Sequence, residues 1–92
     1  MQATYRALAD PTRREILKLL RKGPLAAGSI AGHFPMTKGS LSHHFNLLKA
    51  ADLVRCERRG QQLFYSLNAS VVEDLAASLL NLVGTKKKGE RA

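Results

Sequence analysis

The side chains best able to do chemistry are three histidines and one cysteine. His33, His43 and His44 could ligate a metal, but two of them are adjacent on a predicted helix and diverge by about 100°. No acid or thiolate accompanies them, which argues against a histidine metal site. Cys56 has no second thiol for an internal disulfide and is typical of a small buried residue. Because no carboxylate cluster, nucleophile–base pair or phosphate loop is present either, we expect no enzyme and no cofactor.

Another group of residues has the chemistry to contact nucleic acid. When the segment 38–50 is drawn as a helix at about 100° per residue, its apolar residues Leu41, Phe45 and Leu48 share one face. The opposite face is small and polar and carries no acid: Gly39, Ser42, His43, Asn46. Serine and asparagine can donate to and accept from base edges, and a histidine can donate to guanine. On its own this pattern also fits an ordinary amphipathic surface helix.

A basic hairpin tip is predicted further along the chain. Arg58, Arg59 and Gln61 surround Gly60, between two short extended runs at 54–57 and 63–67. Guanidinium groups on a protruding ribbon can contact the DNA backbone and enter the minor groove. The other interpretation is a charged hairpin that only protects an exposed strand edge. The neighbouring helix 38–50 favours contact with DNA.

The elements that must position these residues follow from caps and turns. We predict a first helix over 2–8 and a second that starts at Asp10-Pro11 and ends at Gly23-Pro24. A third covers 27–34, and the fourth follows Thr37 as its N-cap. Asn68 is expected to cap a last helix over 69–84, which Gly84 stops.

The predicted fold class is therefore mainly α with a small β-hairpin, in the order ααααββα, which is the winged helix-turn-helix plan. We expect one domain over residues 1–84, followed by a basic flexible tail over 85–92. The 15 lysines and arginines against 7 acids give a net charge of +8, which favours a polyanionic partner. The lone cysteine and the absence of a signal segment after Met1 predict a cytoplasmic protein.

The last helix carries an apolar stripe wider than one small core needs. It consists of Val71, Leu75, Leu79 and Leu82, broadened by Val72 and Val83. With Tyr5 and Leu8 the stripe could form the interface of a homodimer. The alternative is a helix that packs only on its own domain.

Three stretches together resemble the ArsR-type bacterial repressors. They are ALADPTRREIL at 7–17, SLSHHFNLL at 40–48, and Arg58-Arg59-Gly60 followed by FYSL at 64–67. The resemblance extends over roughly residues 5 to 68, and the SHH triplet and the sequence at 65–68 look most like the SdpR-type autorepressors within that family. It implies a homodimer on a palindromic operator that represses a promoter, often its own.

The resemblance also implies which residues contact the operator. It places Lys38, Gly39, Ser40, Ser42 and His43 near bases and phosphates. With the remaining polar residues of the helix and the hairpin, the expected DNA-binding set is Lys38, Gly39, Ser40, Ser42, His43, His44, Asn46, Arg58, Arg59 and Gln61.

Many members of that family release DNA when they bind a metal. Their third-helix thiolate pair would fall at Ala26 and Gly28, neither of which can coordinate. Their last-helix ligands would fall at Asp74, Ala76, Lys87 and Glu90, where both histidines are missing. The resemblance therefore implies a repressor that does not sense metal through the usual sites. The SdpR-type likeness implies another form of control, sequestration by a membrane protein.

A function of a different class fits the charge alone. A winged-helix adaptor could bind a protein or an anionic membrane through the lysine run at 86–88. Deleting the tail would then abolish partner binding, whereas changes at Ser42 or His43 would have no effect. The repressor is favoured because it alone explains the polar helix face, the basic hairpin and the apolar stripe together.

Overall fold

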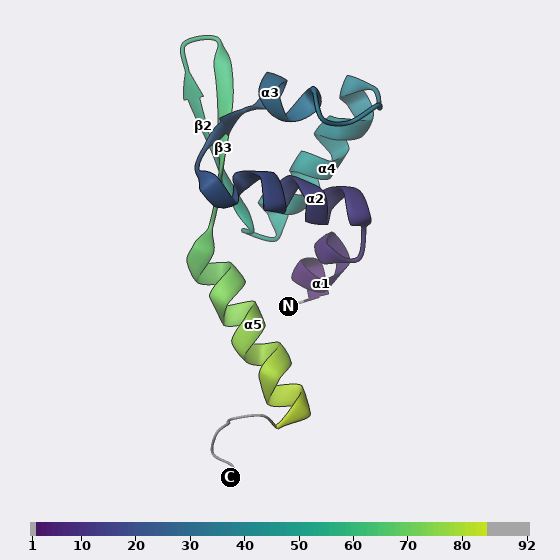
Figure 1. The fold of residues 1–92 in the computed structure, drawn as a ribbon, viewed down its shortest axis with the longest axis vertical. Helices are drawn as coiled ribbons and strands as arrows, with labels where there is room; N and C mark the ends of the chain where they lie inside the picture. The colour runs from purple at the N-terminus through teal and green to yellow at the C-terminus, as the bar shows by residue number, and fades with distance from the viewer. Residues whose placement is uncertain (1, 85–92) are drawn as a thin grey trace.

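The computed structural model describes residues 2–84, so the predicted tail, including Lys87 and Glu90, lies outside the described residues. Figure 1 shows a helical body, a long hairpin on one side and a last helix that projects from the body. The helices are α1 (Gln2–Leu8), α2 (Pro11–Leu19), a 3-10 turn η1 (Leu20–Lys22), α3 (Ala27–Ala31), α4 (Lys38–Ala50) and α5 (Ala69–Val83). The strands are β1 (Leu25–Ala26), β2 (Val54–Arg59) and β3 (Gln62–Leu67). This order confirms the predicted fold class, with one short strand added.

Side-chain caps define where two of the helices begin. Asp10 Oδ2 accepts a hydrogen bond from the backbone N–H of Arg13 at 3.1 Å, and Pro11 occupies the first turn of α2. Thr37 Oγ1 accepts from the backbone N–H of Ser40 at 3.1 Å. Both predicted caps are confirmed, and the second fixes the start of α4.

The sheet is larger than the predicted hairpin. Its strand order is β1-β3-β2 and all pairs are antiparallel. Leu25 of β1 pairs with Tyr65 of β3, so the segment that leads into α3 is attached to the hairpin. The strands of the hairpin also run further than 54–57 and 63–67, because Arg59 pairs with Gln62. Only Gly60 and Gln61 form the turn, and the φ of +62° at Gly60 explains the glycine there.

The core lies between the helices and one face of the sheet. Its largest fully buried side chains are Ile16, Leu20, Ile30, Leu48 and Leu53. The Phe45 ring of α4 stacks on the Tyr65 ring of β3, with centroids 4.2 Å apart and planes inclined by 13°. Leu41, Phe45 and Leu48 are all buried, as the helical pattern predicts. This apolar face fixes the rotation of α4, so its opposite face must point outward.

Two local predictions are wrong. The third helix ends at Ala31, short of the predicted Phe34, because the chain turns through Gly32 and His33. Asn68 occupies the N-cap position of α5 but its side chain caps nothing there. Its Nδ2 instead donates to the carbonyl of Asp52 at 2.9 Å. Asp52 has a left-handed φ of 59°, and the end of β3 passes close enough for Asn68 to take up its carbonyl.

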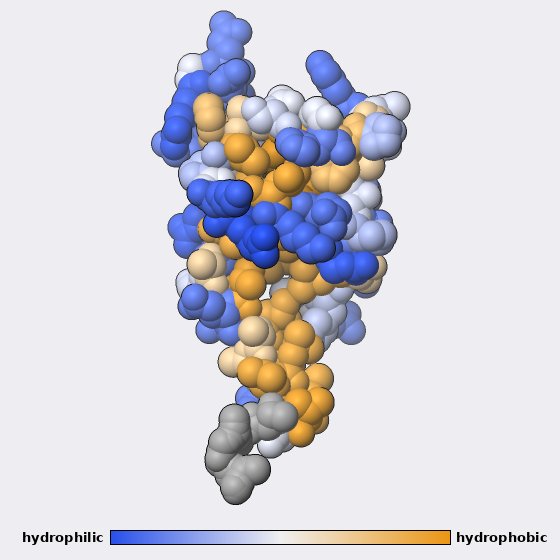
Figure 2. Space-filling view, viewed as in Figure 1, coloured by the Kyte–Doolittle hydropathy of each residue, from blue (hydrophilic) through white to orange (hydrophobic). Residues whose placement is uncertain are grey.

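Helix α5 leaves most of its surface uncovered within the protomer. Leu75 is its one buried residue, whereas Leu79, Leu80, Leu82 and Val83 are exposed. Figure 2 shows apolar residues gathered along the lower end of the molecule, where α5 lies, and hydrophilic residues over the hairpin tip. Gly84 ends the helix with a φ of +69°, as predicted. Within residues 2–84 no helix is both long and apolar enough to cross a membrane.

Candidate nucleic-acid interface

Helix α4 presents a polar outer face to solvent. Gly39, Ser42, His43 and Asn46 are all exposed, on the side opposite the buried apolar residues. Lys38 and Ser40 in the first turn are exposed as well, and α4 contains no acidic residue. This face therefore offers hydrogen-bond donors and acceptors to bases and phosphates without a charge that would repel them.

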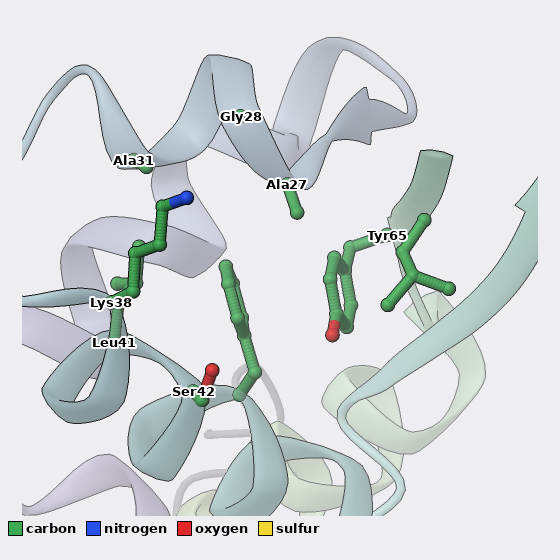
Figure 3. Close-up of a pocket in the computed structure, with 9 residues that line it drawn as sticks. Ala27, Gly28, Ala31, Lys38, Leu41, Ser42 and Tyr65 are labelled. Atoms are coloured by element: carbon green, nitrogen blue, oxygen red, sulfur yellow. The ribbon is translucent and has the colours of Figure 1, made fainter. Parts of the chain in front are cut away.

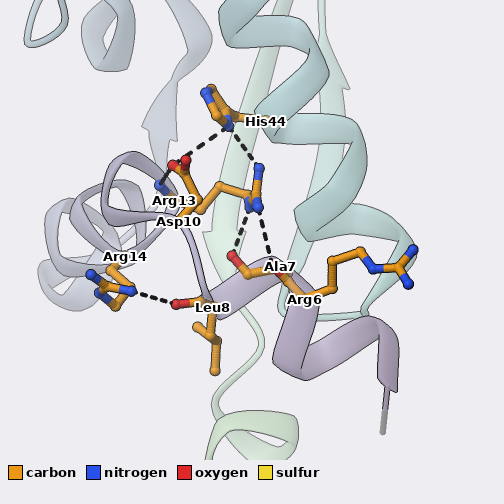
Figure 4. A network of polar contacts seen from close by, with 7 residues as sticks. All are labelled: Arg6, Ala7, Leu8, Asp10, Arg13, Arg14 and His44. Carbon is orange, nitrogen blue, oxygen red and sulfur yellow. Dashed lines mark hydrogen bonds and ion pairs between the residues drawn. The ribbon is translucent and has the colours of Figure 1, made fainter.

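His44 lies apart from the outer face. Its Nδ1 is 2.9 Å from Arg13 Nη1 and 3.8 Å from Asp10 Oδ2, and its side chain is 16% exposed. Figure 4 shows the ring turned toward α2. Because a guanidinium can only donate, the Nδ1 that receives the Arg13 bond is the acceptor nitrogen, and the ring hydrogen lies on Nε2. His44 thus ties α4 to the α1–α2 corner.

Arg13 is the centre of this polar network, and sequence reasoning missed it. Its buried guanidinium donates from Nε to the carbonyl of Ala7 at 2.6 Å and from Nη2 to the carbonyl of Arg6 at 3.1 Å. Both carbonyls belong to the last turn of α1, and that of Arg6 also accepts from the backbone N–H of Ala9 at 3.2 Å. Arg14 Nη1 donates to the carbonyl of Leu8 at 2.7 Å at an exposed site. The only available signal was two adjacent arginines directly after the Asp10-Pro11 helix start.

Asp10 completes the network as an anion. Burial acts to raise the pKa of its carboxyl, but the hydrogen bonds from the backbone N–H groups of Arg13 and Thr12 and the nearby positive charge of Arg13 outweigh it. The pKa is therefore lowered from its ordinary value. The carboxylate keeps its charge in the folded protein, where it caps α2.

The hairpin formed by β2 and β3, the wing, carries its two tip arginines on opposite faces. Arg58 pairs with Leu63 and therefore shares the face that is turned to the core. The guanidinium of Arg59 lies 4.6 Å from the centroid of the Phe64 ring and 3.3 Å from Glu57 Oε1, on the other face. Gln61 is exposed in the turn. The wing thus presents one tip arginine on each face of its two-stranded ribbon.

The predicted interface residues divide into exposed and buried groups. Tyr5, Leu79 and Leu82 are 43%, 45% and 77% exposed, whereas Leu8 and Val71 are half-buried. Leu75 is already buried inside the protomer at 4% exposure. Val83 of the predicted stripe is exposed as well, and Leu80 adds exposed apolar surface that the prediction did not include.

Within the described residues, no three histidine, cysteine or acidic side chains gather as a metal site would require. The rings of His43 and His44 have centroids 6.0 Å apart and are inclined by 54°. His33, in the turn after α3, has its Nδ1 3.1 Å from the carbonyl of Ser29 in that helix. Ala26 lies in β1 and Gly28 in α3, and neither side chain has a donor atom.

A three-helix body, a capped outward-facing helix and a basic β-hairpin define a winged helix-turn-helix DNA-binding protein. Residues 10–55 match the arsR family of bacterial regulatory proteins. The chain is 46% identical to the transcriptional repressor SdpR of Bacillus subtilis, over 90% of this chain and 92% of that protein. It is 34% identical to an arsenical resistance operon repressor of Staphylococcus aureus, over 96% of this chain and 84% of that protein.

Solved structures agree with the sequence comparison. An ArsR-like transcriptional regulator from Rhodococcus superposes with a TM-score of 0.77 at 29% identity, over 90% of this chain and 77% of that one. The chain belongs to the ArsR family of bacterial regulatory proteins. It is a DNA-binding transcriptional repressor of the ArsR/SdpR type, and not an enzyme.

Proposed function

We propose that this repressor binds a palindromic operator as a homodimer, with the outer face of α4 in the major groove. The observation that carries the proposal is that the polar outer face of α4 is wholly exposed while its apolar face is locked into the core. A helix of this kind can enter the major groove only with that face toward the bases. Ser42, His43 and Asn46 would contact base edges, whereas Lys38, Gly39 and Ser40 would approach the backbone.

The network gives His44 a different role from its neighbours. Because its Nδ1 is already bonded to Arg13, we assign it to positioning α4, with only Nε2 left to contact a phosphate. The wing would contact the backbone beside the groove through Arg58, Arg59 and Gln61. Arg59 must then leave its ion pair with Glu57 to contact a phosphate. Because both side chains are exposed, breaking this ion pair costs little free energy.

The second copy is expected to cover the exposed apolar surface of α1 and α5. Tyr5, Leu79 and Leu82 expose large apolar side chains on these two helices, which a stable monomer would not be expected to leave in water. A two-fold axis there would present two copies of α4 to successive major grooves, about 34 Å apart. Leu75 would support this surface from within the protomer.

Control of this repressor is proposed to be independent of metal, and its own promoter is the first operator to test. The residues at the family's usual ligand positions in β1 and α3 cannot coordinate, and the last-helix positions Lys87 and Glu90 lie outside the described residues. Sequestration by a membrane protein rests on the SdpR-type likeness alone, and the proposal does not depend on it.

Binding of the purified protein to its own upstream DNA tests the proposal. Fluorescence anisotropy against scrambled DNA, titrated over salt without added metal, should give selective binding with a steep salt slope. His43→Ala should weaken selective binding, whereas His33→Ala, a change of an exposed histidine in the turn between α3 and α4 that is not among the residues assigned to DNA, should not. Arg59→Ala should reduce the salt slope by about 1, and Arg55→Ala, with the same charge change at the base of β2, should reduce it less.

Equal and weak binding to both DNAs would contradict the proposal. The charge would then serve another partner, and deletion of residues 85–92 would test the adaptor function that charge alone allows.

A further inference from the structure

A hollow of about 300 Å³ lies beside the proposed DNA-binding face, between α3, α4 and β3. Figure 3 shows Ala27 pointing down into it from α3, with the Tyr65 ring beside it. The hollow exists because α3 contributes only small residues, Ala27, Gly28 and Ala31, where a longer side chain would fill the space. Its volume is at the lower end of the range for small-molecule sites.

The lining of the hollow is apolar except at one rim. Leu41, Leu63 and the stacked rings of Phe45 and Tyr65 form the apolar part. Burial and a hydrogen bond with the Cys56 thiol raise the pKa of Tyr65 to about 12, so its phenol stays neutral. The interior thus offers apolar contact without a negative charge.

The polar rim belongs to α4. Lys38 and Ser42 line the hollow, and Figure 3 shows the Lys38 side chain extending from α4 toward α3. Among residues 2–84, Lys38 makes no ion pair with a carboxylate. A cation with no carboxylate partner in the described part of the chain therefore lies at the edge of an apolar hollow, next to a hydroxyl that can donate a hydrogen bond.

We propose that this hollow binds a small organic anion with an apolar body and a single negatively charged head group. The body would lie against the Phe45–Tyr65 stack and the alanines of α3. The head group would accept hydrogen bonds from the Lys38 ammonium and the Ser42 hydroxyl, an arrangement in which a charge-assisted bond fixes the ligand's orientation.

If the proposed function holds, an anion in this hollow would also regulate DNA binding. Lys38 and Ser42 are also expected to contact the operator, so the anion and the DNA would compete for the same two side chains. Binding of either should weaken binding of the other by the same factor. The hollow would then be the site of an inducer that releases the repressor without any metal.

Binding is tested first on the DNA-free protein, with decanoate as the probe and decanol as its neutral match. Titration followed by ¹⁵N–¹H NMR should move the amide signals of Ala27, Lys38, Ser42 and Leu63, and should leave those of α5 in place. Lys38→Gln should weaken decanoate binding by about threefold to fivefold and leave decanol binding unchanged, because one exposed charge-assisted contact is lost. Lys49→Gln, a matched change in the last turn of α4, should alter neither.

Two variants that fill the hollow test anion binding separately from operator binding. Ala31→Leu places a side chain into the hollow and leaves every residue assigned to DNA unchanged in type, and Ala27→Leu does the same from the preceding turn. Each should reduce decanoate binding at least tenfold while thermal unfolding shows an intact fold. Operator binding should persist in both, and decanoate should no longer weaken it.

The outcomes are distinct for the two proposals. Decanoate shifts confined to α5, equal effects of Lys38→Gln on decanoate and decanol, or full binding by both blocking variants would each overturn the anion site. A wild-type protein that binds decanoate in the hollow but shows no selectivity for the operator would overturn the proposed function and leave the site standing.

Discussion

Removing the Arg13 guanidinium should cost far more stability than removing the neighbouring Arg14 guanidinium. Both side chains donate to carbonyls at the end of α1, at 2.6 Å from Arg13 Nε and 2.7 Å from Arg14 Nη1. They differ in environment, because the Arg13 bond is buried and the Arg14 bond is exposed. Water can replace the Arg14 donor after truncation, whereas the carbonyl of Ala7 would be left buried without a partner.

The expected magnitude follows from this difference. Loss of one buried charge-assisted hydrogen bond costs about 1.5–3 kcal/mol, and the part-buried bonds to Arg6 and His44 add less. Loss of the packed methylene stem adds about 1 kcal/mol. Arg13→Ala should therefore lower the free energy of unfolding by about 3 kcal/mol, and Arg14→Ala by about 0.5 kcal/mol.

Urea unfolding at one fixed protein concentration measures both values, since dimerisation would make stability depend on concentration. Arg13→Met keeps an apolar stem without donors and should recover only about 1 kcal/mol of the loss. Equal destabilisation by Arg13→Ala and Arg14→Ala would refute the reasoning. Burial would then not determine how much each hydrogen bond contributes to the free energy of unfolding. Full recovery by Arg13→Met would show that packing rather than hydrogen bonding is lost.

Three further predictions concern DNA binding, assembly and pH. Asn46→Ala should weaken operator binding by about 1–3 kcal/mol, as anisotropy would show, because a group expected to contact a base edge is lost; unchanged affinity would place Asn46 outside the interface. Leu82→Glu puts a charge into the exposed apolar surface of α5 and should yield monomers in sedimentation experiments, whereas Glu73→Gln, elsewhere on α5, should not. The lowered pKa of Asp10 stabilises the folded state above the unfolded value of about 4, and this contribution disappears as pH falls through the folded pKa. The stability difference between wild type and Asp10→Asn should therefore shrink in acid unfolding experiments below about pH 4, and a constant difference would contradict it.

Local signals predicted the part of the fold that positions α4. Thr37 marks the start of α4, because its side chain accepts a hydrogen bond from the backbone N–H of Ser40, three residues later. The spacing of the apolar residues Leu41, Phe45 and Leu48 predicts the buried face of the helix. Such features depend on neighbours along the chain, so one sequence is enough to find them.

Contacts between distant segments were not predictable in the same way. β1 is two residues long and is defined by pairing with β3, forty positions later in the chain (Leu25 with Tyr65), so no periodicity could mark it. Asn68 has the right type for a cap, but the free carbonyl of Asp52 takes its amide instead. Arg13 and His44 meet across thirty-one positions in the chain, so no local pattern could show that His44, named among the DNA-binding residues, also contacts Arg13.

The opposed arginines of the wing have a consequence for how DNA shape would be sensed. A ribbon that carries Arg58 on one face and Arg59 on the other starts its two cations from opposite sides of the strands. If the ribbon enters a minor groove, its two arginines can contact the phosphates of both DNA strands at once only where the groove is narrow. A-tracts narrow the minor groove and deepen its negative potential. Operators flanked by A-tracts should therefore bind more tightly than those with mixed flanks, although no side chain of the wing need touch a base.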